Sequence, residues 1–134
     1  MDSNFAPGHA GVAFSYAGKG MYREAINEYQ EAIKLGGDSP SDQIYLGAFY
    51  AKAGERRKAQ EILKRLETSK EYVSPGELTV LYAALGEREQ AFASLEKAYA
   101  AHDLQLQYLG ADPSFDSLRD DARYKDLMRR VGLS

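Results

Sequence analysis

The chain has 134 residues, of which 44% are hydrophobic and 28% charged, a globular composition that excludes both a disordered and a fibrous chain. Its length is that of one domain, so we expect a single domain over residues 1–134. The formal net charge of -3 disfavours nucleic-acid binding, and the absence of cysteine excludes disulfides, thiolate zinc sites and cysteine nucleophiles.

A repeat organises most of the chain. A tyrosine, a glycine four residues later and an alanine five residues after that occur three times, with offsets of 34 and then 32 residues. The nine residues are Tyr16, Gly20, Ala25, Tyr50, Gly54, Ala59, Tyr82, Gly86 and Ala91. Apolar residues precede each tyrosine by four and follow each alanine by four, which is helical spacing. The repeat therefore predicts successive helical units.

Each unit is expected to be a pair of helices joined by a turn at the glycine. We expect hairpins over residues 6–39, 40–71 and 72–103. The second and third begin with helix-start signals, because Ser39-Pro40 and Ser74-Pro75 each place a capping serine before a proline. The small alanine of each unit predicts a close helix crossing, beside which the tyrosine fills space.

A unit of 34 residues with these key positions resembles the tetratricopeptide repeat (TPR), over residues 6 to about 103. The sequence departs from the family at His9, Gln43 and Pro75, where a large aromatic residue is usual, and in the join between the second and third units, which is two residues short. The resemblance implies an all-α protein, an α-solenoid of about three TPR helical hairpins. In such an array each hairpin contacts mainly its neighbours, and the first helices line a concave face.

The resemblance also implies a peptide groove on the first helices. Its positions are Ala10, Phe14, Ala17, Ile44, Ala48, Lys52, Val80 and Ala84. Among them, only Lys52 is of the type that TPR domains use to grip a terminal carboxylate. A shallow apolar groove suits an amphipathic helix or an extended apolar segment. The alternative is that some of these residues are core.

The two ends resemble parts of longer TPR proteins. Residues 2–7 look like the exit of a preceding unit, which predicts an uncovered first hairpin and a homodimer through it, with Phe5 and Met21 shared between chains. Residues 104–134 are expected to be a degenerate repeat or cap. Residues 107–133 resemble the closing segment of TPR arrays at the C-terminus of bacterial winged-helix regulators, serine/threonine kinases or nucleotide cyclases.

The tail also carries a helical apolar stripe. Tyr124, Leu127, Met128 and Val131 follow the i, i+3, i+4, i+7 pattern, which predicts a short helix. A helix of this length is only marginally stable alone in water. We therefore expect it to pack on the second helix of the third hairpin, near Phe92, Leu95 and Tyr99.

Few residues are candidates for chemistry. The two histidines, His9 and His102, lack a paired carboxylate motif or a phosphate-binding loop, so we expect no enzymatic activity, cofactor or metal. The tyrosines mostly follow the repeat and predict core packing, although Tyr45 and Tyr72 are less clearly buried. Residues 52–70 hold seven basic residues and three glutamates. This excess of positive charge indicates a solvated helix face or, alternatively, a patch for an acidic partner.

The repeat predicts a protein–protein interaction module, and the resemblance of the tail implies that it is the sensor or docking part of a larger bacterial signalling protein. One alternative is a structural spacer or self-association module without a separate partner. Another is RNA binding, which would require a basic groove that this sequence lacks. No apolar run of about 18 residues and no signal peptide are present, so we expect a cytoplasmic protein with no membrane contact.

Overall fold

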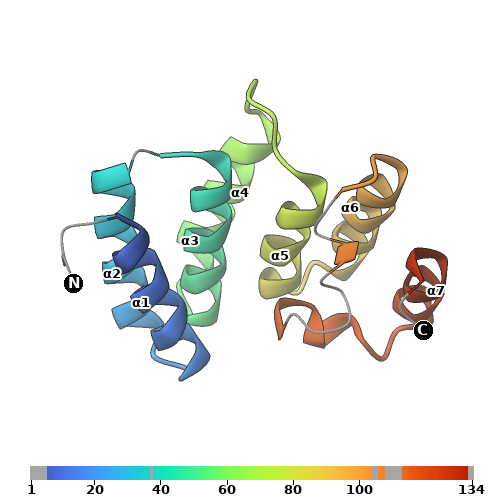
Figure 1. The fold of residues 1–134 in the computed structure, drawn as a ribbon, viewed down its shortest axis with the longest axis horizontal. Coiled ribbons are helices and arrows are strands. Elements are labelled where there is room, and N and C mark those ends of the chain that lie inside the picture. Colours follow the sequence, from blue (N-terminus) through green and yellow to red (C-terminus); the bar gives the residue numbers. More distant parts are fainter. Residues whose placement is uncertain (1–5, 37, 104–105, 108–112, 133–134) are drawn as a thin grey trace. The chain divides into compact units, whose positions relative to one another are not determined.

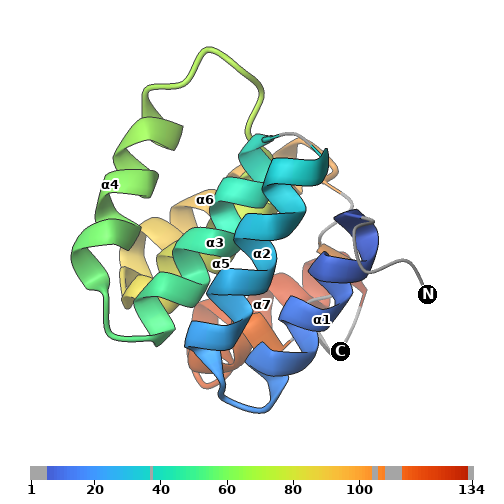
Figure 2. The ribbon, with the colours of Figure 1, turned by 90° about the vertical axis from the view of Figure 1, so that its left-hand side faces the viewer.

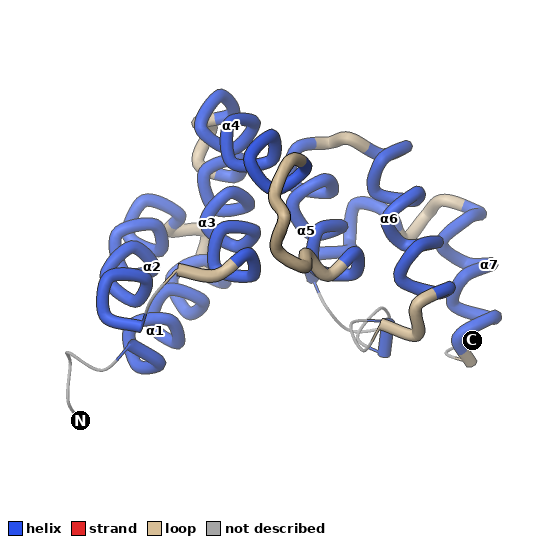
Figure 3. The backbone as a smooth tube through the Cα atoms, turned by 90° about the horizontal axis from the view of Figure 1, so that it is seen from above, coloured by secondary structure: helices blue, strands red, loops and turns tan. Residues whose placement is uncertain are grey.

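The computed structural model describes residues 6–36, 38–103, 106–107 and 113–132. Within these residues all regular structure is helical, with loops between the helices (Figure 3), which confirms the predicted all-α class. None of the helices described is long and apolar enough to cross a bilayer. Internal contacts divide the chain into two units, residues 1–71 and 72–134. Phe5 lies outside the described residues.

The first unit contains two helical hairpins (Figure 1). Helices α1 (Ala6–Gly18) and α2 (Tyr22–Gly36) pack together, as do α3 (Pro40–Lys52) and α4 (Arg56–Glu67). Helix α2 also packs against α3, and the two run side by side in Figure 2. Helix α3 therefore has neighbours on two sides, which buries six of its residues.

The second unit contains the third hairpin and the tail. Helix α5 (Pro75–Leu85) packs against α6 (Arg88–Ala100). The 3-10 helix η2 (Pro113–Leu118) packs against α5, and α7 (Ala122–Val131) packs against α6. Each of the three predicted hairpin ranges thus contains one pair of packed helices.

The three hairpin turns share one hydrogen-bonded motif. Gly20, Gly54 and Gly86 have φ values of 77°, 88° and 76°, in the left-handed region that glycine adopts without steric cost. The N–H after each glycine donates to the carbonyl of the repeat tyrosine at 2.9 Å, and the glycine N–H donates to the carbonyl three residues earlier. This is the Schellman ending of a helix, and it confirms the predicted turns. The alanines that follow, Ala25, Ala59 and Ala91, are fully buried, as predicted for close helix crossings.

Both predicted serine caps form. Ser39 Oγ accepts a hydrogen bond from the Asp42 N–H, and Ser74 Oγ accepts one from the Glu77 N–H, each at 3.2 Å. Asp103 adds a second contact to the start of α5, because its Oδ2 accepts hydrogen bonds from Ser74 Oγ and the Gly76 N–H. The end of the third hairpin is thereby tied to its beginning.

The tail packs on α6, as its apolar stripe predicts. The stripe has two buried residues, Tyr124 and Leu127, and two half-buried ones, Met128 and Val131. Beside it, the Arg123 guanidinium lies 4.2 Å from the Phe92 ring centroid, and that of Arg130 lies 4.9 Å from the Tyr99 centroid. Two arginines of α7 therefore cover the aromatic side chains expected beneath the stripe.

Ion pairs join the same two helices. Arg130 bonds Glu96 of α6 through both terminal nitrogens, and Arg123 Nη2 lies 2.9 Å from Glu89 Oε2 of α6. The pKa of Glu96 is held below its ordinary value of 4.5, mainly because Arg130 donates hydrogen bonds to its carboxylate. The pKa of Asp121, the cap of α7, is lowered mainly because the side chain of Arg123, and then its backbone N–H, donate to it.

We expect acid to loosen α7 from α6. A carboxylate whose pKa is lower in the folded protein than in the unfolded chain contributes stability above its unfolded pKa, and loses it as the pH falls. The Tm of the second unit should therefore decrease from about pH 5 toward pH 3. The double variant Glu96→Gln, Asp121→Asn should show a smaller decrease in calorimetric melts across this range.

Asp120→Asn is the matched control, because Asp120 makes no ion pair within the described residues and is adjacent to Asp121. This variant should keep the wild-type pH profile. An unchanged profile in the double variant would show that these pairs do not hold α7.

Candidate functional site

An aromatic cluster joins α1, α2 and α3 in the first unit. The Phe14 ring makes edge-to-face contacts with Tyr29, Tyr45 and Phe49, at centroid distances of 5.7, 5.3 and 5.7 Å. Tyr29 and Phe49 are buried, whereas Phe14 is 44% exposed. Because edge-to-face pairs contribute about 0.5–1.5 kcal/mol beyond burial, three of them hold a half-exposed ring in one orientation.

Exposed apolar side chains are concentrated in the first hairpin. Single exposed apolar residues are ordinary, and only a contiguous patch of them marks a contact surface. Four of the five large hydrophobic residues found exposed in the described part of the chain lie there. They are Val12, Phe14, Met21 and Leu35, and the fifth is Tyr72.

The predicted groove residues of the first unit fall into two groups. Ile44 and Ala48 are buried, with exposed fractions of 0% and 6%, and so they contribute to packing around α3. Ala10 and Ala17 are half-buried and lie one turn on either side of Phe14 along α1. Lys52 is exposed, and its amine has no ion-pair or hydrogen-bond partner in the part of the chain described.

The other two predicted groove residues, Val80 and Ala84, lie on α5 in the second unit. Val80 is buried, with 4% of its surface exposed, and Ala84 is half-buried. The surface around Phe14 therefore does not include them.

Tyr45 is a surface residue that the groove prediction omitted. It is half-buried against Phe14 and lies two turns before Lys52 on the same side of α3. The sequence did contain a signal for it. Tyr45 does not occupy the repeated tyrosine position, so its burial in the core was less clearly expected than that of the other tyrosines. We define the Phe14 surface as Ala10, Phe14, Ala17, Tyr45 and Lys52.

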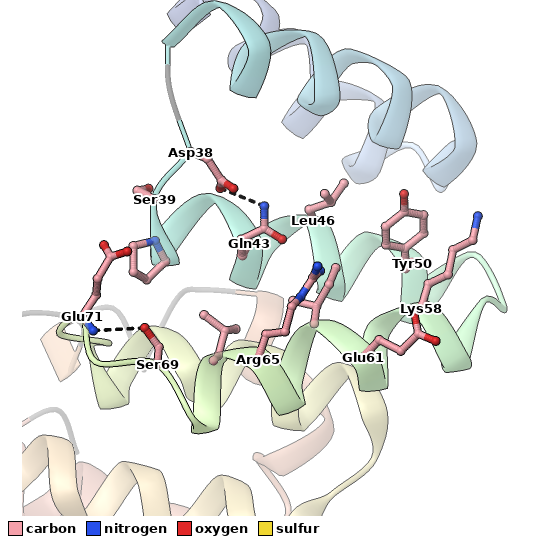
Figure 4. A pocket seen from close by; sticks show the side chains of 13 residues that line it. Asp38, Ser39, Gln43, Leu46, Tyr50, Lys58, Glu61, Arg65, Ser69 and Glu71 are labelled. Atoms are coloured by element: carbon pink, nitrogen blue, oxygen red, sulfur yellow. Dashed lines mark hydrogen bonds between the residues drawn. The ribbon is translucent and has the colours of Figure 1, made fainter.

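A separate feature of the first unit is a hollow between α3 and α4, the α3–α4 cleft, with a volume of about 540 Å³ (Figure 4). Its floor is formed by four buried side chains, Leu46 and Tyr50 of α3 and Ile62 and Leu66 of α4. Charged residues line its rim: Asp38, Lys58, Glu61, Arg65 and Glu71. The cleft combines an apolar base with charges of both signs.

Most polar groups of the cleft already have partners. Tyr50 Oη accepts a hydrogen bond from Gln30 Nε2 at 2.9 Å, and Asp38 Oδ1 accepts one from Gln43 Nε2 at 2.8 Å. Lys58 Nζ lies 5.3 Å from the Tyr50 ring centroid and 3.3 Å from a Glu55 carboxylate oxygen.

Arg65 differs from these groups. Its guanidinium has no ion pair or hydrogen bond within the described residues, and Figure 4 shows its side chain extending from α4 toward α3.

The histidines have separate surroundings. His9 Nδ1 lies 2.6 Å from Glu28 Oε2, which links the two helices of the first hairpin. His102 is exposed and borders a hollow of about 510 Å³ in the second unit, whose cation, Arg130, is already paired with Glu96. Within the described residues, no group of three or more histidine, aspartate or glutamate side chains is arranged to hold a metal ion.

Comparisons with known proteins identify no relative. No protein-family model matches the chain, and no curated protein or solved structure matches it either.

Proposed function

We propose that this chain is a protein-interaction module that binds an apolar segment of another protein at the Phe14 surface. The observation that supports this most directly is the half-exposed Phe14 ring, held by three aromatic contacts. The repeated hairpins, which resemble the TPR family, support the same function.

The Phe14 surface has the properties of a binding hot spot. A rigid aromatic ring loses little conformational entropy when a partner covers it. Ala10 and Ala17 are small, so the backbone of a partner helix or extended segment can approach α1 closely beside Phe14. The amine of Lys52, which has no partner among the described residues, would pair with a carboxylate at the edge of that segment.

The wider role follows from the tail. Residues 107–133 resemble the end of TPR arrays in bacterial winged-helix regulators, serine/threonine kinases and nucleotide cyclases, which favours a sensor or docking role in a cytoplasmic signalling protein. In this proposal the partner is a protein or peptide, and no nucleic acid, membrane, cofactor or catalytic step is involved.

Selection of a displayed peptide library on the purified chain tests the site. We expect the selected peptides to share apolar residues at helical or extended spacing, and Phe14→Glu to weaken their binding by at least about tenfold, measured by calorimetric titration.

Tyr72→Glu is the matched control, because Tyr72 is also an exposed aromatic residue but lies in the second unit. It should bind as the wild type does. Equal affinity of the wild type and a folded Phe14→Glu variant would remove the Phe14 surface from the proposal.

Self-association through the first hairpin is the second candidate function. It is favoured by the number of exposed apolar side chains in the first hairpin, of which Val12, Met21 and Leu35 lie outside the Phe14 surface. A dimeric mass by light scattering that Val12→Glu converts to a monomer, together with no selected peptide, would support this alternative.

A further inference from the structure

We propose that the α3–α4 cleft is a second peptide-binding site, which recognises a segment with one carboxylate between apolar side chains. This inference goes beyond the proposed function, because it involves neither Phe14 nor its neighbours. It rests on the size of the cleft, its apolar floor and Arg65, whose guanidinium has no partner among the described residues.

The floor of the cleft is apolar but largely covered by the fold. Leu46, Ile62 and Leu66 border the hollow and are 6%, 3% and 7% exposed, so a bound segment would contact only the outermost atoms of each. A volume of about 540 Å³ falls within the range of sites that hold a small ligand or a few side chains of a peptide. Apolar side chains of a bound segment would displace water from this floor.

Arg65 supplies the specificity. A guanidinium offers donors in a planar fork that matches a carboxylate with two parallel hydrogen bonds. The neighbouring cation of the cleft, Lys58, is already engaged by Glu55 and by the Tyr50 ring, whereas Arg65 is not engaged by any described residue. Arg65 is itself exposed at the rim, so solvent partly screens a carboxylate that pairs with it, and the apolar floor beside it contacts the neighbouring side chains of the segment.

The ends of the cleft restrict where that carboxylate can lie. Figure 4 shows Asp38 and Glu71 toward one end, Lys58 and Glu61 toward the other, and Arg65 between them. Further negative charge on the ligand would approach the carboxylates of Asp38, Glu61 or Glu71 and be repelled. A single central acidic residue with neutral or basic flanks therefore fits the cleft better than a polyacidic segment.

An array of nine-residue peptides, acetylated and amidated to remove terminal charges, tests this site. Each peptide has a central glutamate and leucines at varied spacing on both sides, and is paired with the same peptide carrying glutamine. In fluorescence titrations the best glutamate peptide should bind at least about tenfold tighter than its glutamine pair. In Arg65→Gln the ratio of the two affinities should fall below about twofold, since the guanidinium that pairs with the glutamate carboxylate is absent.

Lys64→Gln provides the matched control, because it removes the same charge from the adjacent position of α4, outside the cleft lining. It should keep the tenfold ratio, and so should Phe14→Glu, which separates this site from the Phe14 surface. The proposal is overturned if no glutamate peptide binds at about 1 mM. It is likewise overturned if Arg65→Gln leaves the ratio unchanged, or if peptides with three acidic residues bind tightest.

Discussion

Removal of residues 111–134 should lower the Tm of the second unit by more than about 10 °C and cause aggregation at micromolar concentration. This segment contributes four side chains that are at most 2% exposed: Phe115, Leu118, Tyr124 and Leu127. Burial of each is worth about 1.5–3 kcal/mol before the entropy of ordering the segment is subtracted. Its loss would also uncover the apolar surfaces of α5 and α6. Calorimetry and light scattering measure the two effects.

Two point variants separate the packing of α7 from the effect of shortening the chain. Leu127→Ala removes a buried side chain and should destabilise the second unit by about 2–5 kcal/mol, whereas Lys125→Ala, at an exposed position of the same helix, should change stability by less than about 0.5 kcal/mol. A truncated chain that melted like the full chain and stayed monomeric would show that the tail contributes nothing to the stability of α5 and α6.

The hairpins were predictable because their signals are local. The tyrosine and the glycine four residues later form one helix ending, whose hydrogen bonds span only five residues, so a repeated pair predicts a repeated turn. The serine caps are equally local, since each involves a backbone N–H three residues away.

The contacts of the tail were predictable only in part. Its apolar stripe marks the buried face of a helix, but stripes do not identify ion-pair partners. The partners of Arg123 and Arg130, Glu89 and Glu96, both precede them by 34 residues. That offset equals the first repeat spacing and was a signal available in the sequence.

The groove residues were harder to assign, because α3 is apolar on all sides. Its residues 44–51 include no charged side chain, so helical periodicity cannot separate a face that binds a ligand from one that packs on neighbouring helices. Ile44 and Ala48 are buried within the fold, whereas Phe14 lies on α1, which packs mainly against α2 and keeps an exposed face.

The α3–α4 cleft could not be deduced from the pattern at all. Asp38 and Glu71 belong to loops on either side of the second hairpin, and only the folded backbone brings them to one end of the same hollow. The excess of basic residues in residues 52–70 indicated a charged helix face, but not that Arg65 is the one over an apolar floor.

Enlarging the buried alanine of the third hairpin should destabilise the second unit strongly. Ala91 is fully buried near the start of α6, where this helix crosses α5. In Ala91→Leu the added carbons have no free space, so the helices must separate or adopt strained rotamers, at a cost of about 1–3 kcal/mol. For a unit of this size, the Tm should fall by about 5–20 °C in calorimetric melts.

Ala93→Leu is the matched control, because it makes the same substitution at a position where the larger side chain is not crowded. Ala93 lies on the same helix but is exposed, and leucine and alanine both favour helices, so its Tm should stay within about 2 °C of the wild type. If the three alanines are equivalent positions of one repeat, Ala25→Leu and Ala59→Leu should destabilise the first unit in the same way. A tolerated leucine at Ala91, but not at the other two, would indicate that α5 and α6 cross at a wider distance than the helices of the first two hairpins.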